Sequence, residues 1–384
     1  MKITDLASTI VCVPYKEPEP WAWGIGHYGV NAIVVEVSTD EGIVGVGEGT
    51  SPHASAEYSQ IILDSAGKLL VGEDPCDIER IMRKVWGAGL IDHRVVSGIE
   101  MALWDIVGKS CKKPLHKLLG GAVTNKVPFA PYLNRKKPED MAEQADAFTK
   151  QGFGTFNIKV GIDDEEDIEA VRAVRESVGD KLKIRVDANL AWTPSLAIKM
   201  IKRLERFDIE FVEDPTYING MSRVRNAVDT PICSGAETLQ EIFRVAKDGA
   251  ADIIGHIDPK MQGGILNSKK ACAICEAAGL PVVGHAGWEL SIGTHAILHI
   301  AASTPNFILP NQTYYMYLTD DICRQGMLTF EDGCMRVPEE PGLGIELDRD
   351  KVAKYSENFK RQGGFSIYER AKKEKAKILP YPIY

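Results

Sequence analysis

The chain has 384 residues, of which 44% are hydrophobic and 26% are charged. These proportions are typical of a folded globular protein and exclude a disordered, collagen-like or coiled-coil chain. Its 45 basic and 54 acidic residues give a net charge of −9, and no long basic run occurs, so we expect no binding to nucleic acid or to membranes.

The cysteines and the apolar runs indicate the compartment. The eight cysteines are scattered along a chain that is long enough to bury its own core, which does not indicate a disulfide scaffold. The segment MKITDLASTIVCVP does not resemble a signal peptide, and no run of about 18 apolar residues occurs. We therefore expect a cytoplasmic protein.

The first 125 residues predict a small α+β domain. Residues 1–13 and 31–48 have the apolar patterns of strands, with Asp-Glu-Gly as a hairpin signal. Residues 16–30 are rich in Pro, Gly and aromatic residues without periodicity, and we expect a loop there. Helical spacing follows over residues 55–71 and 75–119.

Residues 126–325 predict a second domain, in which short apolar strands alternate with amphipathic helices. We expect strands at 127–133, 155–160, 183–189, 209–215, 231–237, 252–258, 280–286 and 306–312. Helices are expected at 138–151, 164–177, 194–207, 219–228, 238–249, 265–278 and 289–303. This alternation is the signature of an α/β protein with a parallel (β/α)₈ barrel.

Residues 326–384 return to irregular and strand-like sequence. We expect residues 327–348 to form a hairpin that leads into a Pro-Gly turn and folds back onto the N-terminal domain. The end of the chain is helix-like and then rich in proline, and we assign it no function.

Six chemically active residues stand at the predicted strand ends, where such barrels carry their active sites. They follow one another at intervals of about one strand and one helix: Lys159, Asp187, Glu213, Glu237, Asp258 and His285. We therefore expect them to converge from six consecutive strands.

Asp187, Glu213 and Glu237 are the candidate metal ligands. Each acid alone has an ordinary alternative as a solvated or helix-capping carboxylate. Three acids in one barrel mouth would repel one another unless a cation lay among them. Oxygen ligands with positions left for water and substrate favour Mg²⁺.

The other three residues are candidates for proton transfer. Lys159 lies one strand before the first acid, where a metal and limited water would lower its pKa and make it usable as a base. Asp258 can orient His285 and select its tautomer. The alternative for His285 is a satisfied core histidine.

These residues, with four sequence segments, resemble the mandelate racemase and muconate lactonizing enzyme branch of the enolase superfamily. The segments are IEMALWDIVGK (99–109), VDANLAWT (186–193), FVEDP (211–215) and PGLGIELD (341–348). The resemblance implies a modified TIM (β/α)₈-type barrel under an α+β capping domain, which is built from the N-terminal region and the C-terminal segment. The corresponding division is 1–125, 126–325 and 326–384.

The resemblance also implies a mechanism. Mg²⁺ bound by Asp187, Glu213 and Glu237 would hold the carboxylate of a small-molecule substrate. Loss of the proton next to that carboxylate would give an enediolate, which the metal and nearby cations stabilise. In the racemase-like subgroup the two bases are the second lysine of a K-x-K motif and a histidine paired with an aspartate, which match Lys159 and His285 with Asp258.

Two positions distinguish the subgroups. The muconate-type branch carries a lysine five residues before a Gly-Gly pair, and in HIDPKMQGG that place is Asp258, which favours the racemase-like assignment. Lys260 is nearby on the same strand face. The chain has Asn157 where the first lysine of K-x-K would stand, and its amide can still donate a hydrogen bond to a substrate carboxylate.

Substrate choice in this family comes from loops of the capping domain. An aromatic lid that excludes water and stacks on the substrate is expected there, although the same residues could instead pack on the core of the cap. The candidates in the cap are Trp21, Trp23, His27, Tyr28 and His53, and in the barrel Glu289 and Asn311.

Three functional hypotheses follow. The first is a Mg²⁺-dependent dehydratase of a hydroxy acid such as a sugar acid, favoured because this chemistry is common in the branch. The second is a racemase, epimerase or cycloisomerase that uses the same two bases. The third is a non-catalytic binding protein on the same fold, suggested by Asn157. We also expect a homo-oligomer.

Overall fold

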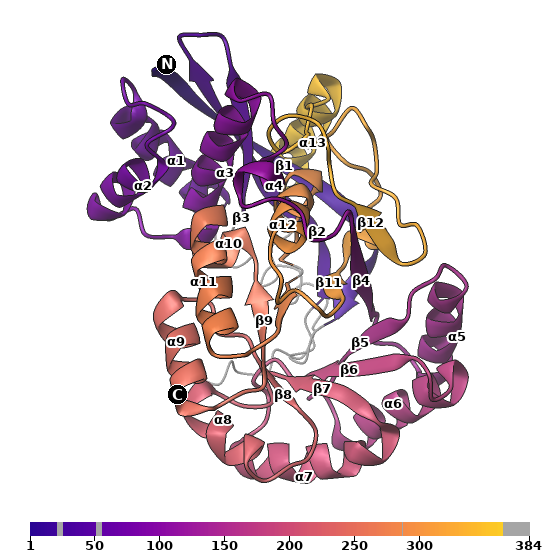
Figure 1. The fold of residues 1–384 in the computed structure, drawn as a ribbon. Coiled ribbons are helices and arrows are strands. Elements are labelled where there is room, and N and C mark those ends of the chain that lie inside the picture. The colour runs from indigo at the N-terminus through magenta and orange to yellow at the C-terminus, as the bar shows by residue number, and fades with distance from the viewer. Residues whose placement is uncertain (21–25, 51–55, 286, 364–384) are drawn as a thin grey trace.

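The computed structural model describes residues 1–20, 26–50, 56–285 and 287–363. Figure 1 shows a cap, built from the beginning and the end of the chain, that lies over one end of a barrel. The fold is the modified TIM-type barrel with an α+β cap that the sequence predicts.

The sheet of the cap has three antiparallel strands, β1 (Ile3–Pro20), β2 (Gly26–Thr39) and β3 (Val44–Thr50). The loop predicted at 16–30 was wrong for residues 16–20 and 26–30, because the pairing of β1 with β2 continues past a register shift to Pro20 and Gly26, while residues 21–25 lie outside the described residues. Backbone hydrogen bonds hold this part of the hairpin, so it does not need the apolar alternation that marks a strand in sequence.

Four helices complete the N-terminal part of the cap: α1 (Ala56–Leu70), α2 (Ile78–Gly87), α3 (His93–Ser110) and α4 (Leu115–Leu118). Helix α3 packs directly on β3. A Cβ at Gly47 would lie 1.9 Å from the carbonyl oxygen of Gly98, so this close approach of strand and helix requires glycine.

Eight parallel strands form the barrel. They are β4 (Lys126–Leu133), β5 (Thr155–Lys159), β6 (Lys183–Asp187), β7 (Ile209–Glu213), β8 (Ile232–Ser234), β9 (Ile253–Ile257), β10 (Val282–Gly284) and β11 (Asn311–Thr313). The barrel closes where the N–H of Gly284 donates to Oδ1 of Asn311 at 2.8 Å.

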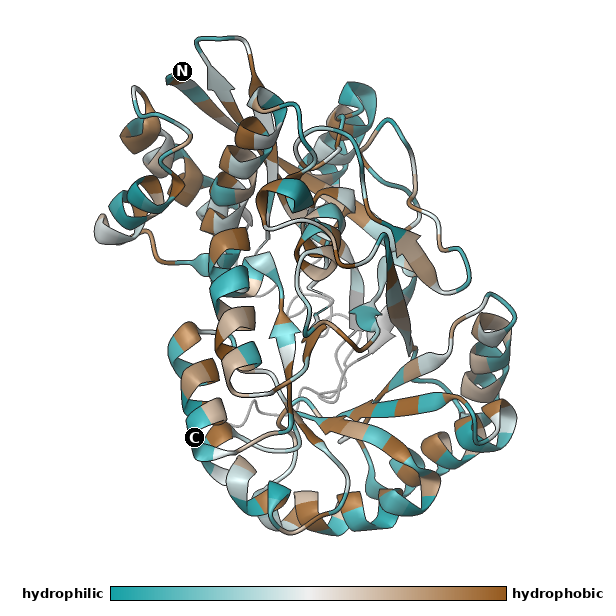
Figure 2. Ribbon diagram, in the orientation of Figure 1, coloured by the Kyte–Doolittle hydropathy of each residue, from teal (hydrophilic) through white to brown (hydrophobic). Residues whose placement is uncertain are grey.

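Helices cover the outside of the barrel, with their polar faces toward solvent (Figure 2). They are α5 (Pro138–Thr149), α6 (Asp164–Val178), α7 (Pro194–Leu204), α8 (Ile218–Arg225), α9 (Leu239–Asp248), α11 (Ile265–Ala277) and α12 (Ser291–Ala302). The seven predicted helices are confirmed to within a few residues. A short helix that the sequence did not predict, α10 (Pro259–Gln262), follows β9.

The last barrel strand and the C-terminal segment differ from the prediction. Strand β11 covers only 311–313 instead of 306–312. The predicted hairpin at 327–348 is reduced to a tight turn in which Glu331 and Cys334 pair, and β12 (Cys334–Arg336) pairs mainly with barrel strand β4. The chain then enters a helix that we had not predicted, α13 (Arg349–Gln362), which packs against β1 of the cap.

Two buried glutamates of the cap join it to the barrel. Glu100 of α3 accepts the N–H groups of Ile265 at 2.6 Å and Leu266 at 2.9 Å, at the first turn of α11. Glu48 of β3 accepts those of Leu290 and Gly293, each at 3.1 Å, at the first turn of α12. Each carboxylate satisfies helix N–H groups that have no partner within the helix.

Within the part of the chain that the structure describes, no helix has the length and apolar character needed to cross a membrane.

The joint at Glu100 predicts a pH dependence of stability. Burial raises the pKa of Glu100 from 4.5 to about 7, so between these values the folded state holds a proton that the unfolded chain has lost. Stability therefore falls as the pH rises through this window, by an amount of order 3 kcal/mol from this group. Urea unfolding at pH 5 and pH 8 should show a smaller difference for Glu100→Gln than for the unchanged protein.

Glu276→Gln, at an exposed position on the same α11, is the matched control for this experiment and should keep the full difference. An unchanged difference in Glu100→Gln would contradict the assignment.

Candidate active site at the mouth of the barrel

The six predicted residues lie at or just beyond the carboxyl ends of consecutive strands. Lys159, Asp187 and Glu213 are the last residues of β5, β6 and β7, and the strand register places them side by side. Glu237, Asp258 and His285 follow the ends of β8, β9 and β10. The arrangement puts charged groups on neighbouring strands, at the end of the barrel that faces the cap (Figure 1).

Lys159 and Asp187 form a buried ion pair. Nζ of Lys159 is 2.6 Å from Oδ2 of Asp187, which also accepts the hydroxyl of Tyr132 at 3.2 Å. Burial works to raise the pKa of Asp187, but the ammonium of Lys159 outweighs it and the pKa is lowered. Asp187 is therefore held as a carboxylate.

Glu213 and Glu237 share one imidazole. Nε2 of His256, on β9, is 3.2 Å from Oε1 of Glu213, and its Nδ1 is 3.9 Å from Oε1 of Glu237. Burial works to lower the pKa of His256, but hydrogen bonds with the two acids raise it well above its ordinary value. Glu237 is also 2.8 Å from Nη2 of Arg94, at the start of α3 in the cap.

The three acids are thus each paired with a cation of the chain. Burial and the neighbouring Asp187 raise the pKa of Glu213, which shows the repulsion between the acids. Among the described residues, no three His, Cys, Asp or Glu side chains are gathered closely enough to hold a metal ion. The carboxylates of Asp187 and Glu213, which are buried, and of Glu237, which is partly exposed, nevertheless fit the oxygen ligands that a hard divalent cation requires.

Asp258 and His285 face each other at the other side of the mouth. Oδ2 of Asp258 is 3.6 Å from Nδ1 of His285, and the imidazole rings of His256 and His285 lie 4.2 Å apart between their centroids. Burial and the positive charge of His256 lower the pKa of His285 to about 4. His285 is therefore neutral near pH 7 and can accept a proton.

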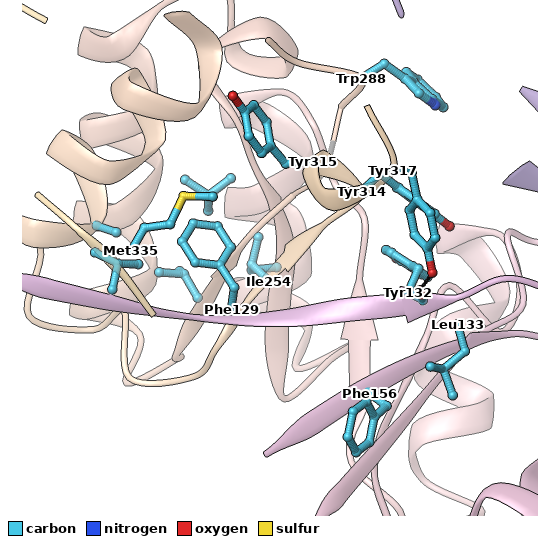
Figure 3. Close-up of a cluster of buried hydrophobic side chains, with 14 of the residues drawn as sticks. Phe129, Tyr132, Leu133, Phe156, Ile254, Trp288, Tyr314, Tyr315, Tyr317 and Met335 are labelled. Atoms are coloured by element: carbon cyan, nitrogen blue, oxygen red, sulfur yellow. Dashed lines mark hydrogen bonds between the residues drawn. The ribbon is translucent and has the colours of Figure 1, made fainter. Parts of the chain in front are cut away.

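Aromatic side chains support the lysine. The ring of Tyr132 lies 4.3 Å from Nζ of Lys159 and stacks on Tyr314 at 4.5 Å between centroids. The hydroxyl of Tyr317 donates to the carbonyl oxygen of Tyr132 at 2.8 Å (Figure 3). This packing restricts Tyr132, and through it the surroundings of the ammonium of Lys159.

Asn157, a predicted substrate ligand, uses its amide nitrogen inside the barrel. Its Nδ2 donates to the carbonyl oxygen of Ala130, on the neighbouring strand β4, at 2.8 Å, and the residue is 1% exposed. The amide thus ties two barrel strands together below Lys159.

The residues predicted to line the pocket lie in different parts of the chain. Trp21, Trp23 and His53 lie outside the described residues, as does the side chain of His27, and Tyr28 lies in β2. Two further predicted residues contact other residues inside the protein. Glu289 is 3.5 Å from Lys260, and Asn311 closes the barrel through Gly284.

Four groups of the site were not predicted from the sequence. They are Arg94, His256, Gln312, whose amide donates to Glu213, and Lys260, which we noted only as a neighbour of Asp258. His256 alone carried a signal, since it lies two residues before Asp258 in the strand predicted at 252–258, where residues two apart are expected on the same side. Arg94 comes from the cap, and no spacing rule connects it with a barrel strand.

The loop after Lys159 has its own anchor. Nη1 of Arg135 donates to the carbonyl oxygen of Lys159 at 3.3 Å, and its Nη2 is 2.8 Å from Oδ1 of Asp167. Asp167 also accepts the N–H of Gly161 at 2.6 Å. Both side chains are at most 8% exposed, so this is a buried ion pair that fixes the end of β5.

Fold and site together define a class: a barrel enzyme with acid and base residues at the strand ends under a cap. Comparison with known proteins agrees. Residues 7–120 match the mandelate racemase / muconate lactonizing enzyme N-terminal domain, and residues 140–351 match the enolase C-terminal domain-like family. The chain belongs to the mandelate racemase/muconate lactonizing enzyme family of the enolase superfamily.

Relatives in this family catalyse several reactions. The chain is 35% identical to a hydrophobic dipeptide epimerase of Enterococcus faecalis, over 90% of this chain and 99% of the relative. It is 32% identical to an arabinonate dehydratase of Saccharolobus solfataricus, over 86% and 91%. A crystal structure of the Enterococcus faecalis epimerase with Mg and the dipeptide L-Leu-L-Tyr superposes with a TM-score of 0.85 at 31% identity and covers 90% of this chain and all of that one. The chain is thus an enzyme of the lyase or isomerase type, and the binding-protein hypothesis is wrong.

The anchor at Lys159 predicts a strong pairwise coupling. Arg135→Met leaves Asp167 as a buried charge without its partner, so we expect a loss of about 3–5 kcal/mol in the free energy of unfolding. Asp167→Asn added to Arg135→Met should recover part of that loss, because no unpaired charge is left. Urea unfolding of the two single variants and the double variant measures the coupling.

Strictly additive effects of the two substitutions would show that the pair does not act as a unit.

Proposed function

We propose that this enzyme removes the proton next to the carboxylate of a small organic acid, with Lys159 and His285 as bases on the two sides of the substrate. The position of the two bases carries the proposal. Lys159 ends β5 and His285 follows β10, so they lie on either side of the arc of strands β6, β7 and β8 that carries the acids.

Asp187, Glu213 and Glu237 are the residues that would hold Mg²⁺. To do so they must exchange their contacts with Lys159, His256 and Arg94 for the metal, which would relieve the repulsion that raises the pKa of Glu213. Bound there, Mg²⁺ would supply positive charge beside the substrate carboxylate and make the neighbouring C–H more acidic. The Mg-containing crystal structure of the Enterococcus faecalis epimerase supports this assignment.

Lys159 acts on one face of the substrate. Lys159 is 7% exposed and its Nζ lies against the ring of Tyr132, so little water competes with a substrate there. Once released from Asp187, Nζ can lose its proton and accept the substrate proton. Arg135 holds the carbonyl group of Lys159 and so fixes the direction from which the side chain enters the mouth.

His285 acts on the other face. It is neutral because burial and His256 lower its pKa to about 4, so it is ready to accept a proton rather than to donate one. Asp258 faces Nδ1, stabilises the imidazolium that forms, and leaves the other ring nitrogen for the substrate.

This protonation state favours transfer of the proton between faces, which is racemisation or epimerisation. One base removes the proton and the conjugate acid of the other returns one to the opposite face. Dehydration, the outcome preferred from the sequence, remains the second candidate. It requires a protonated His285 when the β-hydroxyl leaves, and the arabinonate dehydratase of Saccharolobus solfataricus supports it.

Deuterium exchange tests the two-base proposal. We expect the protein with Mg²⁺ in D₂O to incorporate deuterium at the α-carbon of at least one member of a panel of dipeptides, acylated amino acids, hydroxy acids and sugar acids, followed by proton NMR. Lys159→Ala and His285→Asn should each abolish exchange with one of the two stereoisomers of that compound.

Exchange that survives in both variants would refute the assignment of the bases. Loss of water, seen as a 2-keto acid product, would select dehydration over epimerisation for that compound.

Metal binding is tested without substrate. A ligand at a hundredfold excess over its Kd stabilises the folded state by about 2.7 kcal/mol, so saturating Mg²⁺ should raise the Tm by several degrees, and EDTA should reverse the rise. Glu213→Gln should remove the effect. Glu143→Gln, an exposed residue of α5, is the control and should retain it.

An equal response to Mg²⁺ in Glu213→Gln and in the control would contradict the ligand assignment.

A further inference from the structure

One buried lysine beside the mouth is not used by the chemistry described so far. Lys260, in α10, is 1% exposed, and three carboxylates surround its Nζ. The distances are 3.5 Å to Oε2 of Glu289, 3.8 Å to Oε1 of Glu48 and 4.0 Å to Oδ2 of Asp258. These acids come from three separate parts of the chain, and none of them is more than 8% exposed.

The three buried carboxylates around Lys260 require its positive charge. Burial works to lower its pKa, but the attraction of Asp258, Glu289 and Glu48 raises it above the ordinary value, so it stays an ammonium. Its loss would leave three carboxylates buried without a cation, which is strongly unfavourable.

Lys260 contacts the acid of the proposed base pair twice. Its backbone N–H donates to Oδ1 of Asp258 at 2.8 Å, and its ammonium faces Oδ2, the oxygen that also faces Nδ1 of His285. The backbone of Gly287 closes over this contact. A Cβ at Gly287 would lie 2.2 Å from Oδ2 of Asp258 and 3.3 Å from both Nδ1 of His285 and Cε of Lys260. Glycine at position 287 therefore leaves the space that this carboxylate oxygen occupies beside His285 and Lys260.

The other end of the cluster belongs to the cap. Glu48 of β3 faces Lys260 and also accepts the N–H groups of Leu290 and Gly293, at the start of α12. Leu290 follows Glu289 directly in the chain, and Gly293 lies four residues after it. One carboxylate of the cap therefore contacts both the cation and the segment that carries a second acid of the cluster.

We propose that Lys260 is a positioning residue for His285, an inference that rests on the function proposed above. Its ammonium holds Asp258 as an oriented carboxylate, so that His285 keeps a single tautomer with the proton on Nδ1, and Glu48 links this arrangement to the seating of the cap. Lys260 itself does not touch the substrate.

The tautomer of His285 is the readout that tests this role. Full-length protein labelled with [¹⁵N]histidine is studied with Mg²⁺ alone, and the His285 signals are assigned by their loss in His285→Asn. The unchanged protein should show the Nδ1–H tautomer, and Lys260→Met should show a mixture of both tautomers. Lys260→Arg keeps the charge and should restore the single form.

The kinetic expectation uses the panel compound that exchanges fastest. Lys260→Met should lower kcat about 10- to 100-fold and change KM by less than about threefold, because second-sphere partners orient a group without binding substrate. Lys269→Met is the matched control, since Lys269 of α11 bonds the carbonyl oxygen of Ser303 away from the site, and it should leave both readouts unchanged. If Lys260→Met does not fold, Lys260→Gln carries the same expectation.

The outcomes separate the two proposals. A single Nδ1–H tautomer and an unchanged kcat in Lys260→Met overturn the positioning role alone. Exchange that persists in both Lys159→Ala and His285→Asn overturns the proposed function and this inference with it.

Discussion

Burial of several carboxylates at one end of the barrel is the constraint on which the site depends. Asp187, Glu213 and Asp258 are at most 3% exposed, and an unpaired charge at such a depth would be far more costly than any single packing contact can offset. The chain meets this constraint with cations from neighbouring staves and from the cap. The pairings of Asp187 with Lys159 and of Asp258 with Lys260 follow from it.

The same constraint explains why the cap and the barrel form one unit. Glu48 and Glu100 leave the cap as buried carboxylates and end on N–H groups at the first turns of α12 and α11. Burial raises the pKa of each to about 7, so both joints are sensitive to charge. Arg94 adds a third contact by reaching Glu237 from α3. A displacement of the cap would therefore expose or unpair charges at the mouth of the barrel. The position of the cap is thus coupled to the candidate active site.

The sequence predicted the parts of the fold in which periodicity and burial coincide. Each barrel helix has an amphipathic pattern, and each of the first seven barrel strands has a short apolar run. The ends of these strands correctly located Lys159, Asp187 and Glu213 in the fold. Strand β11 was misplaced because the apolar run at 306–310 precedes the residues that pair with β4. Helix α13 was missed because its residues are mostly polar, and it is held by contacts with β1 that lie far away in sequence.

The partners of the site residues could not be predicted in the same way. Spacing along the chain identifies residues that share a strand end, but not the residues that reach them from another element. Asn157 shows the limit most clearly. As a strand residue two positions before Lys159 it has the place of a substrate ligand, yet its amide bonds the carbonyl oxygen of Ala130. A lysine there would bury a second ammonium under Lys159 in a space that the structure fills with a neutral hydrogen bond. The positive charge at this mouth therefore comes from His256 and Arg94 as well as from Lys159, that is, from three elements instead of one strand.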